Sequence, residues 1–233
     1  MVKHRLTRAP KIGYAHAVLG LTVLTTAFGS HAAQAATADT ASVKAPAAQV
    51  ITDETYTKTH TVKAHTVKAR VTAAQVLTLA ARQIGTREDA SGGGTKFQKW
   101  YMNSPRATET VRRDGGSKAE YRNAAWCAMF VSWVGEQTGA RSTVGWDAYT
   151  VTYAKWFKNN KRWGNTPKPG AVVYYAWDGS KSLDDIDHVG FVVKDNHNGT
   201  ITTIEGNTGN GEVEKRVRPK SQVVGYGYPE YAS

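Results

Sequence analysis

Cys127 is the single cysteine of this 233-residue chain, and its surroundings suit a reactive thiol. The segment from Trp126 to Val131 is apolar on almost every side, which predicts a buried central helix with Cys127 in its first turn. A helix N-terminus carries partial positive charge that favours thiolate over thiol, and its N–H groups can stabilise an oxyanion. The competing interpretation is a small buried hydrophobic residue. One cysteine excludes an intramolecular disulfide and a thiolate-rich metal site.

A cysteine nucleophile needs a base, and two histidines follow residue 70. His188 opens a strand-like run and shares a predicted face with Gly190, which we expect to leave open space beside the ring. His197 lies in a polar turn, and we expect it to be exposed. The alternative for His188 is a structural histidine.

The base in turn needs a partner that orients it. Glu205 and Asn207 stand two residues apart on or just after a predicted strand, so they are expected to project to the same side. Either side chain can hold an imidazole N–H, as the third member of a catalytic triad does. The alternative is an ordinary strand-end glutamate and a turn asparagine, because Gly206 and Gly209 interrupt the strand.

Helical patterns must position the cysteine. They cover residues 72–85, 97–101, 123–139 and 149–158. In the first of these helices, Thr72 is a suitable N-cap, the apolar stripe runs from Val76 to Ile84, and Gly85 is expected to end it. Asn123 is the expected N-cap of the helix that carries Cys127. Residues 103–122 look irregular and polar.

Strand patterns follow Pro169 and Gly170 and must position the base and its partner. The β-branched and aromatic runs cover residues 171–177, 188–194, 200–205, 213–217 and 223–228. Helices first and an antiparallel meander afterwards predict an α+β fold, with N-terminal helices packed on an antiparallel sheet. With 40% hydrophobic residues the chain is globular rather than fibrous or disordered.

Five segments in this order resemble the CHAP family, the cysteine- and histidine-dependent amidohydrolases and peptidases of bacterial cell walls. They are residues 126–133 around the cysteine, 169–173, 187–192 around the histidine, 204–207 with the Glu-x-Asn pattern, and 224–229. The resemblance extends over about residues 72–231. The ordered combination is specific, whereas each segment alone is weak.

The resemblance implies a papain-like α+β fold and a catalytic set. Cys127 would be the nucleophile, His188 the general base and then acid, Glu205 the residue that orients His188, and Asn207 an assisting residue. The implied reaction is hydrolysis of an amide through a thioester acyl-enzyme. A non-enzymatic wall-binding protein on the same fold is the alternative, although a pure binder has no need of this set. A second papain-like wall peptidase family, in which the cysteine follows Asp and precedes Ser, does not match Trp126 and Ala128.

The N-terminal 70 residues have a different composition from the rest. Residues 1–35 combine four basic residues, an apolar stretch at 15–28 and an Ala-x-Ala site at 33–35, which predicts a cleaved secretion signal rather than a retained membrane anchor. Residues 36–70 contain a direct repeat of His-Thr-Val-Lys-Ala and are expected to form a flexible basic linker. The linker is either a solvated spacer or a segment that adheres to an anionic wall polymer. Residues 71–233 are then the catalytic domain.

The expected partner is peptidoglycan outside the cytoplasm. Without residues 1–35 the chain has 26 basic and 19 acidic residues, a net charge of +7, and this mild positive charge suits an anionic substrate. We expect a monomer, no membrane contact after signal cleavage, no nucleic-acid partner, no cofactor and no metal. Some family members bind calcium ahead of the cysteine, but residues 115–125 offer only Glu120. The acidic run Asp184, Asp185 and Asp187 is expected to be solvated loop charge. Both the muramoyl–alanine amide and a stem or cross-bridge peptide remain candidate bonds.

Overall fold

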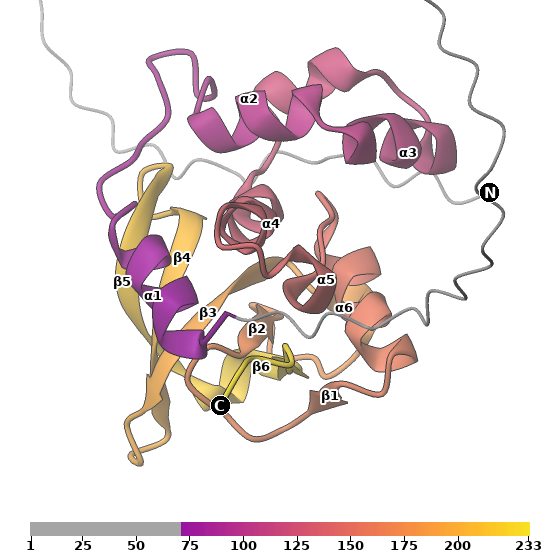
Figure 1. The fold of residues 1–233 in the computed structure, drawn as a ribbon. Coiled ribbons are helices and arrows are strands. Elements are labelled where there is room, and N and C mark those ends of the chain that lie inside the picture. The colour runs from indigo at the N-terminus through magenta and orange to yellow at the C-terminus, as the bar shows by residue number, and fades with distance from the viewer. Residues whose placement is uncertain (1–70) are drawn as a thin grey trace, which may run out of the picture. The chain divides into compact units, whose positions relative to one another are not determined.

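Six helices precede or flank a six-stranded antiparallel sheet in the computed structural model, which describes residues 71–233 (Figure 1). The predicted α+β architecture is therefore confirmed. The signal peptide and linker predicted for residues 1–35 and 36–70 lie outside the described residues. No helix within residues 71–233 is long and apolar enough to cross a membrane. The helices are α1 (Ala73–Ala81), α2 (Lys96–Asn103), α3 (Pro105–Asp114), α4 (Cys127–Gln137), α5 (Arg141–Val144) and α6 (Thr150–Asn159).

The sheet has the strand order β1-β6-β2-β3-β4-β5, and every neighbouring pair is antiparallel. β2 to β5 form the expected meander. The last strand, β6, pairs with β2 instead of extending the meander after β5, and the two-residue strand β1 was not expected. The strands are β1 (Trp163–Gly164), β2 (Val172–Tyr175), β3 (His188–Asp195), β4 (Thr200–Thr208), β5 (Glu212–Pro219) and β6 (Val223–Gly227).

The first helix begins as predicted and ends earlier. The Thr72 hydroxyl accepts from the N–H of Gln75, whose side chain returns to the Thr72 N–H in a capping box. The helix stops at Ala81 rather than near Gly85, because the chain tightens into turns of i→i+3 hydrogen bonds after it. Ile84 is therefore outside the helix and is 47% exposed, so it does not belong to the buried stripe.

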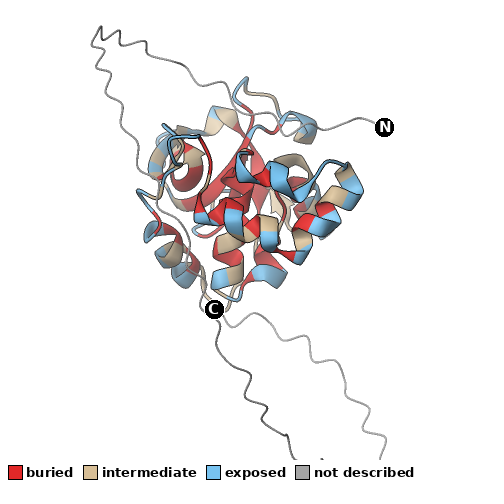
Figure 2. Ribbon diagram, turned by 90° about the horizontal axis from the view of Figure 1, so that it is seen from above, coloured by how far each residue is buried: buried red, intermediate tan, exposed pale blue. Residues whose placement is uncertain are grey.

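The central helix α4 lies between the α2–α3 pair and the sheet (Figure 1). Eight of its eleven residues are buried, as its all-round apolar sequence predicts. Figure 2 shows the buried residues gathered in the middle of the domain, with exposed positions on the outer faces of the helices. The helix begins at Cys127 and not near Asn123, because residues 123 and 124 form a bend ahead of it.

The prediction of an irregular stretch at residues 103–122 was wrong. The stretch contains α3 and a 3₁₀ turn at Lys118–Arg122. Ser104 caps α3 by accepting from the N–H of Ala107, and Pro105 occupies the first helical position. This helix has almost no apolar stripe to reveal it in the sequence, because it is held chiefly by polar contacts.

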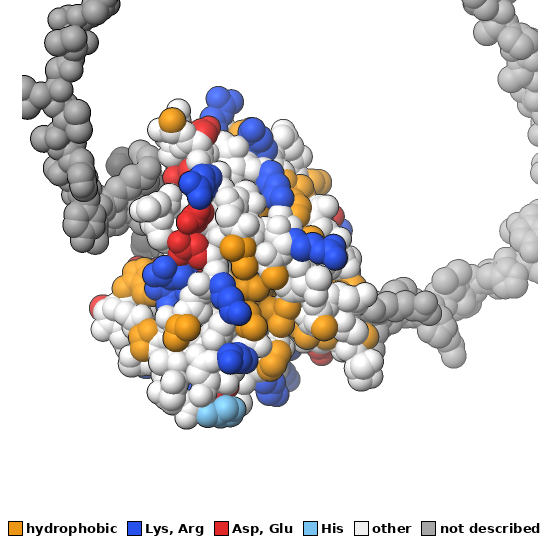
Figure 3. Space-filling model, turned by 90° about the vertical axis from the view of Figure 1, so that its left-hand side faces the viewer, with side chains coloured by type: hydrophobic (Ala, Val, Ile, Leu, Met, Phe, Trp, Pro, Cys, Tyr) orange, Lys and Arg blue, Asp and Glu red, His pale blue; other side chains and the backbone are white. Residues whose placement is uncertain are grey.

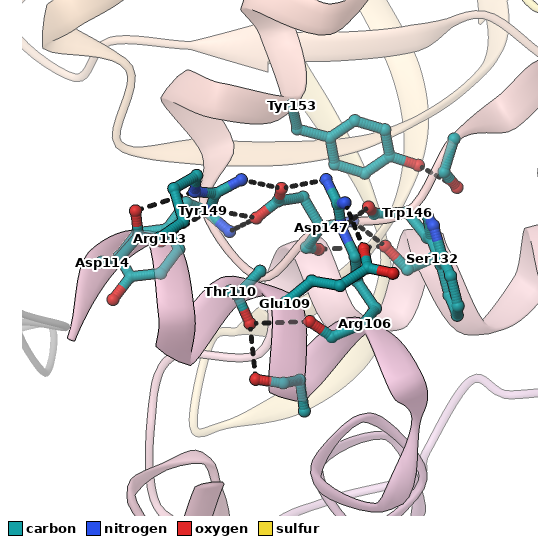
Figure 4. Close-up of polar contacts among 12 residues, drawn as sticks. Arg106, Glu109, Thr110, Arg113, Asp114, Ser132, Trp146, Asp147, Tyr149 and Tyr153 are labelled. Atoms are coloured by element: carbon teal, nitrogen blue, oxygen red, sulfur yellow. Dashed lines mark hydrogen bonds and ion pairs between the residues drawn. The ribbon is translucent and has the colours of Figure 1, made fainter. Parts of the chain in front are cut away.

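Those polar contacts converge on Asp147, a carboxylate that is 2% exposed (Figure 4). It accepts from Arg106 Nη2 at 3.0 Å and from Arg113 Nη1 at 2.9 Å, both on α3. The backbone of Asp147 exchanges two hydrogen bonds with the Ser132 hydroxyl of α4, and its carboxylate also accepts from the Tyr149 N–H just before α6. One buried residue, through its carboxylate and its backbone, therefore ties α3, α4 and α6 together.

The two ends of the described chain meet. The Ala232 N–H donates to the Val71 carbonyl at 2.9 Å, and the Tyr231 hydroxyl donates to the carbonyl of Gly170 at 2.8 Å. Residues 71 and 232 are thus neighbours at the edge of the fold, close to the start of the sheet.

Asp147→Asn should lower the free energy of unfolding by about 3 kcal/mol, at the low end for a broken buried ion pair because both arginines are partly exposed. The matched control is Asp184→Asn, which removes an exposed partner of Lys155 and should cost less than about 1 kcal/mol. Urea denaturation followed by circular dichroism measures both. Equal losses in the two variants would show that Asp147 does not hold the helices.

Candidate active site

Cys127 is the first residue of α4 and is 5% exposed. The residue before it is anchored on two sides, since Trp126 Nε1 donates to Glu88 Oε1 at 3.0 Å and the indole stacks on Phe97. Gly206 of β4 lies against this helix, where an added Cβ would come within 2.6 Å of the Phe130 side chain. Only glycine therefore allows β4 to approach α4 closely enough to bring its site residues near the thiol.

His188 is the first residue of β3 and lies between two of the predicted site residues. Its Nε2 is 3.0 Å from Glu205 Oε2, and the ring also interacts with the Cys127 side chain closely enough for that side chain to raise its pKa. Because Nε2 faces the carboxylate, Nδ1 is the ring nitrogen left for the thiol. The structure therefore brings Cys127, His188 and Glu205 together, and both of the other side chains interact with the imidazole.

The expected open space beside Gly190 does not exist. A Cβ added at this glycine would lie 2.6 Å from Glu205 Cγ and 3.0 Å from the carbonyl oxygen of Ile204. The carboxylate side chain fills the space that the missing Cβ leaves. Gly190 thus serves the site by letting β4 place Glu205 beside the imidazole.

Glu205 is fully buried, and its two oxygens are saturated with donors. Oε1 accepts from the Thr203 hydroxyl at 2.6 Å and from Arg218 Nε at 3.0 Å, and the Tyr175 hydroxyl lies 3.4 Å from it. Oε2 is shared between His188 and Arg218, whose Nη2 is 2.6 Å away. A buried carboxylate needs such compensation because its desolvation is costly.

Arg218 is the neighbour that the sequence analysis missed. It lies on β5, thirteen residues after Glu205, and is 15% exposed. In the sequence it is one of several charges that alternate along the strand, and nothing local distinguishes it from Arg216. The register of β4 with β5 pairs Arg218 with Ile201 and Glu205 with Glu214, and the guanidinium reaches the carboxylate diagonally across the two strands.

Asn207 is placed differently from the expectation. The register of β4 and β5 shifts between Glu205 and Thr208, and Asn207 has a φ of 55° within this irregularity. Regular strand alternation therefore does not apply to the pair Glu205 and Asn207. Among the described contacts, the second partner of Glu205 is Arg218, and no hydrogen bond joins Asn207 to His188.

The electrostatics of the site favour a charged histidine. Burial alone would lower the pKa of His188, but its interactions with Cys127 and Glu205 raise it to about 9. Burial alone would raise the pKa of Glu205, but hydrogen bonds and charges of His188 and Arg218 hold it well below its usual range. At neutral pH the site therefore holds an imidazolium beside a carboxylate.

Trp177 covers one side of this array. Its ring centroid lies 5.2 Å from that of His188 and 5.6 Å from that of Tyr175, and the Arg218 guanidinium sits 5.0 Å from the indole. The side chain is 41% exposed, so one part of the indole faces solvent. The polar core of the site is thereby partly shielded from water, which strengthens the interactions inside it.

His197 lies apart from this cluster. As predicted, it is exposed, at 86% of its side chain, in the β3–β4 turn. Within the described residues, no group of three or more His, Cys, Asp or Glu side chains is arranged to hold a metal ion. In the acidic run, Asp184 pairs with Lys155, Asp185 accepts from Ser180, and Asp187 accepts from the Trp177 N–H.

The high pKa of His188 gives the fold a measurable pH dependence. An imidazole whose pKa rises on folding adds stability that is complete below its unfolded pKa of about 6.5 and is lost as pH rises through the folded value. The free energy of unfolding should therefore fall between about pH 6.5 and 9. His188→Gln should flatten this slope, whereas His197→Gln should retain it. A slope that survives in His188→Gln would assign the titration to another group.

A comparison with protein families matches residues 118–207 to the family described as the CHAP domain. The matched segment holds Cys127, His188, Glu205 and Asn207, and it stops before Arg218. A search of curated proteins found no match, and a search of solved structures found none either.

Proposed function

We propose that this protein is a secreted peptidoglycan hydrolase with a cysteine nucleophile. Residues 118–207 match the CHAP domain, a family of amidase and peptidase hydrolases that act on peptidoglycan. The observation that carries the proposal is the position of His188, which hydrogen-bonds Glu205 and also interacts with the Cys127 side chain. This is the relation of nucleophile, base and orienting group that acyl transfer requires.

The proposed chemistry has two halves. The Cys127 sulfur attacks the amide carbonyl carbon, and the oxyanion that forms lies near the N–H groups at the start of α4. His188, which holds the thiol proton as an imidazolium, gives that proton to the leaving amine as the carbon–nitrogen bond breaks. The neutral imidazole then takes a proton from water, whose oxygen displaces the thiolate from the thioester. Glu205 balances the imidazolium charge in both halves.

The substrate class follows from the family and from charge. Residues 71–233 hold 21 basic and 16 acidic residues, a mild positive excess that suits an anionic wall. The predicted signal peptide would deliver the enzyme to the wall, and the basic linker would act as a spacer or add adhesion to an anionic wall polymer. The bond to be cut is the muramoyl–alanine amide or a stem or cross-bridge peptide bond.

A non-enzymatic wall-binding protein is the alternative, and the buried site argues against it. Burying Glu205 beside a charged histidine lowers stability through the cost of desolvation, and a protein that only binds the wall gains nothing from this arrangement. Perturbed titratable groups of this kind concentrate at catalytic centres.

The two domain histidines provide the sharpest test of the mechanism. His188→Ala should lower the initial rate on purified peptidoglycan by about 10³–10⁴-fold, as loss of a triad member does. His197→Ala should change it by less than about threefold, since this side chain is exposed and outside the site. Glu205→Gln should fall between them, because an amide still accepts from the ring but does not balance its charge. An inactive His197→Ala with an active His188→Ala would contradict the assignment.

Alkylation separates the cysteine mechanism from simple wall binding. Iodoacetamide should modify Cys127, the only thiol, and digestion should stop in proportion to the modified fraction. Wall binding, measured by co-sedimentation, should persist. Full digestion after complete modification would refute a cysteine nucleophile. Mass spectrometry of the soluble products from the unmodified enzyme would identify which amide bond is cut.

A further inference from the structure

We propose that Arg218 is a positioning residue of the catalytic centre, which fixes Glu205 and limits how firmly this carboxylate holds the His188 imidazolium. The inference rests on the proposed function, because it concerns the same cysteine–histidine pair. It assigns a role in proton transfer to a residue on β5. This residue lies outside the segment that matches the family.

The contacts show how Arg218 fixes the carboxylate. Its Nε lies 3.0 Å from Glu205 Oε1, and its Nη2 lies 2.6 Å from Oε2, which is the two-point geometry of a guanidinium–carboxylate pair. The guanidinium is itself held, since Nη2 also donates to the Thr208 hydroxyl at 2.9 Å. With the Thr203 hydroxyl on Oε1, the carboxylate can turn only by breaking several hydrogen bonds. Oε2 is thereby kept facing His188 Nε2.

Sharing of Oε2 also sets the strength of the histidine–glutamate pair. A carboxylate that interacts only with His188 would stabilise the imidazolium fully and oppose release of its proton to a leaving amine. The positive charge of Arg218 on the same oxygen offsets part of that attraction. The side chain is 15% exposed and the indole of Trp177 packs over it, so solvent screens this charge only in part.

The groups around the pair come from four elements. Cys127 of α4 contacts His188, while Tyr175 of β2 and Thr203 of β4 contact Glu205. Arg218 is the only fixed cation among the described side chains that bond to the carboxylate. Removing it should therefore raise the pKa of His188, because an imidazolium is favoured when a neighbouring positive charge is lost.

Arg216 offers a matched control on the same strand. It is two residues from Arg218 and so projects to the same face of β5, but it pairs with Glu214 at 2.9 Å and is 40% exposed. On the side of the domain that carries β5, acidic side chains lie among Lys and Arg side chains at the surface (Figure 3). Two ion pairs of β5 residues, Arg216–Glu214 and Arg87–Glu212, involve partly exposed side chains. The two arginines therefore separate a site effect from a surface-charge effect.

The direct experiment measures the His188 imidazole by NMR with labelled ring nitrogens in the full chain, with Cys127→Ala as the common background. Arg218→Gln should raise the pKa of His188 by about one unit, whereas Arg218→Lys and Arg216→Gln should leave it within about 0.3 unit. In the chain with its cysteine, Arg218→Gln should lower kcat about tenfold to a hundredfold, and the alkaline limb of the rate profile should move to higher pH. Arg218→Lys should keep that limb in place and still lose about tenfold in kcat, because an ammonium cannot hold both oxygens.

The outcomes separate this inference from the proposed function. An unchanged His188 pKa in folded Arg218→Gln, or an equal shift in Arg216→Gln, would overturn the role of Arg218 while leaving the hydrolase intact. If Arg218→Gln does not fold, Arg218→Lys decides, because an undiminished kcat in that variant would overturn the positioning role. Failure of the unaltered enzyme to digest peptidoglycan would instead contradict the proposed function, and the imidazole titration would still test the arginine.

Discussion

The rest of the site depends on the hydrogen bonds that the buried carboxylate of Glu205 accepts. It is fully removed from solvent, yet it stands between two cationic side chains and accepts further hydrogen bonds from Thr203 and Tyr175. A charge in this position is stable only while every donor is in place, since an unpaired buried carboxylate carries a large desolvation cost. The strands that supply those donors must therefore keep their register, and the register in turn fixes where His188 lies.

Two glycines allow β4 to pack closely against β3 and against the helix that begins with Cys127. At Gly190 the missing Cβ leaves room for the Glu205 side chain, and at Gly206 it leaves room for Phe130 and Trp126 of the cysteine segment. Any larger residue would push β4 away from either β3 or α4. The thiol, the imidazole and the carboxylate thus meet because β4 lies unusually close to β3 at Gly190 and to α4 at Gly206. A side chain at either glycine would prevent this approach.

The sequence was sufficient for features that local patterns encode. The capping box at Thr72, the all-round apolar helix that opens at Cys127, and the strand that His188 begins depend on neighbours in the chain, and these are present in the fold. Features that depend on distant partners were missed. Helix α3 is held by Asp147, more than thirty residues away, and Arg218 reaches Glu205 only through cross-strand pairing. The bulge at Asn207 likewise arises from a register shift that no local pattern predicts.

The meeting of Val71 with Ala232 gives the domain a modular character. A domain whose ends are hydrogen-bonded neighbours can be joined to other sequences at either end, or inserted whole into a surface loop of a host protein, without stretching its own chain. The same geometry would tolerate circular permutation, with new ends opened in an exposed turn such as the one at His197, far along β3 from its catalytic end. Sequences attached at either end can therefore be exchanged without pulling on the strands that hold His188 and Glu205.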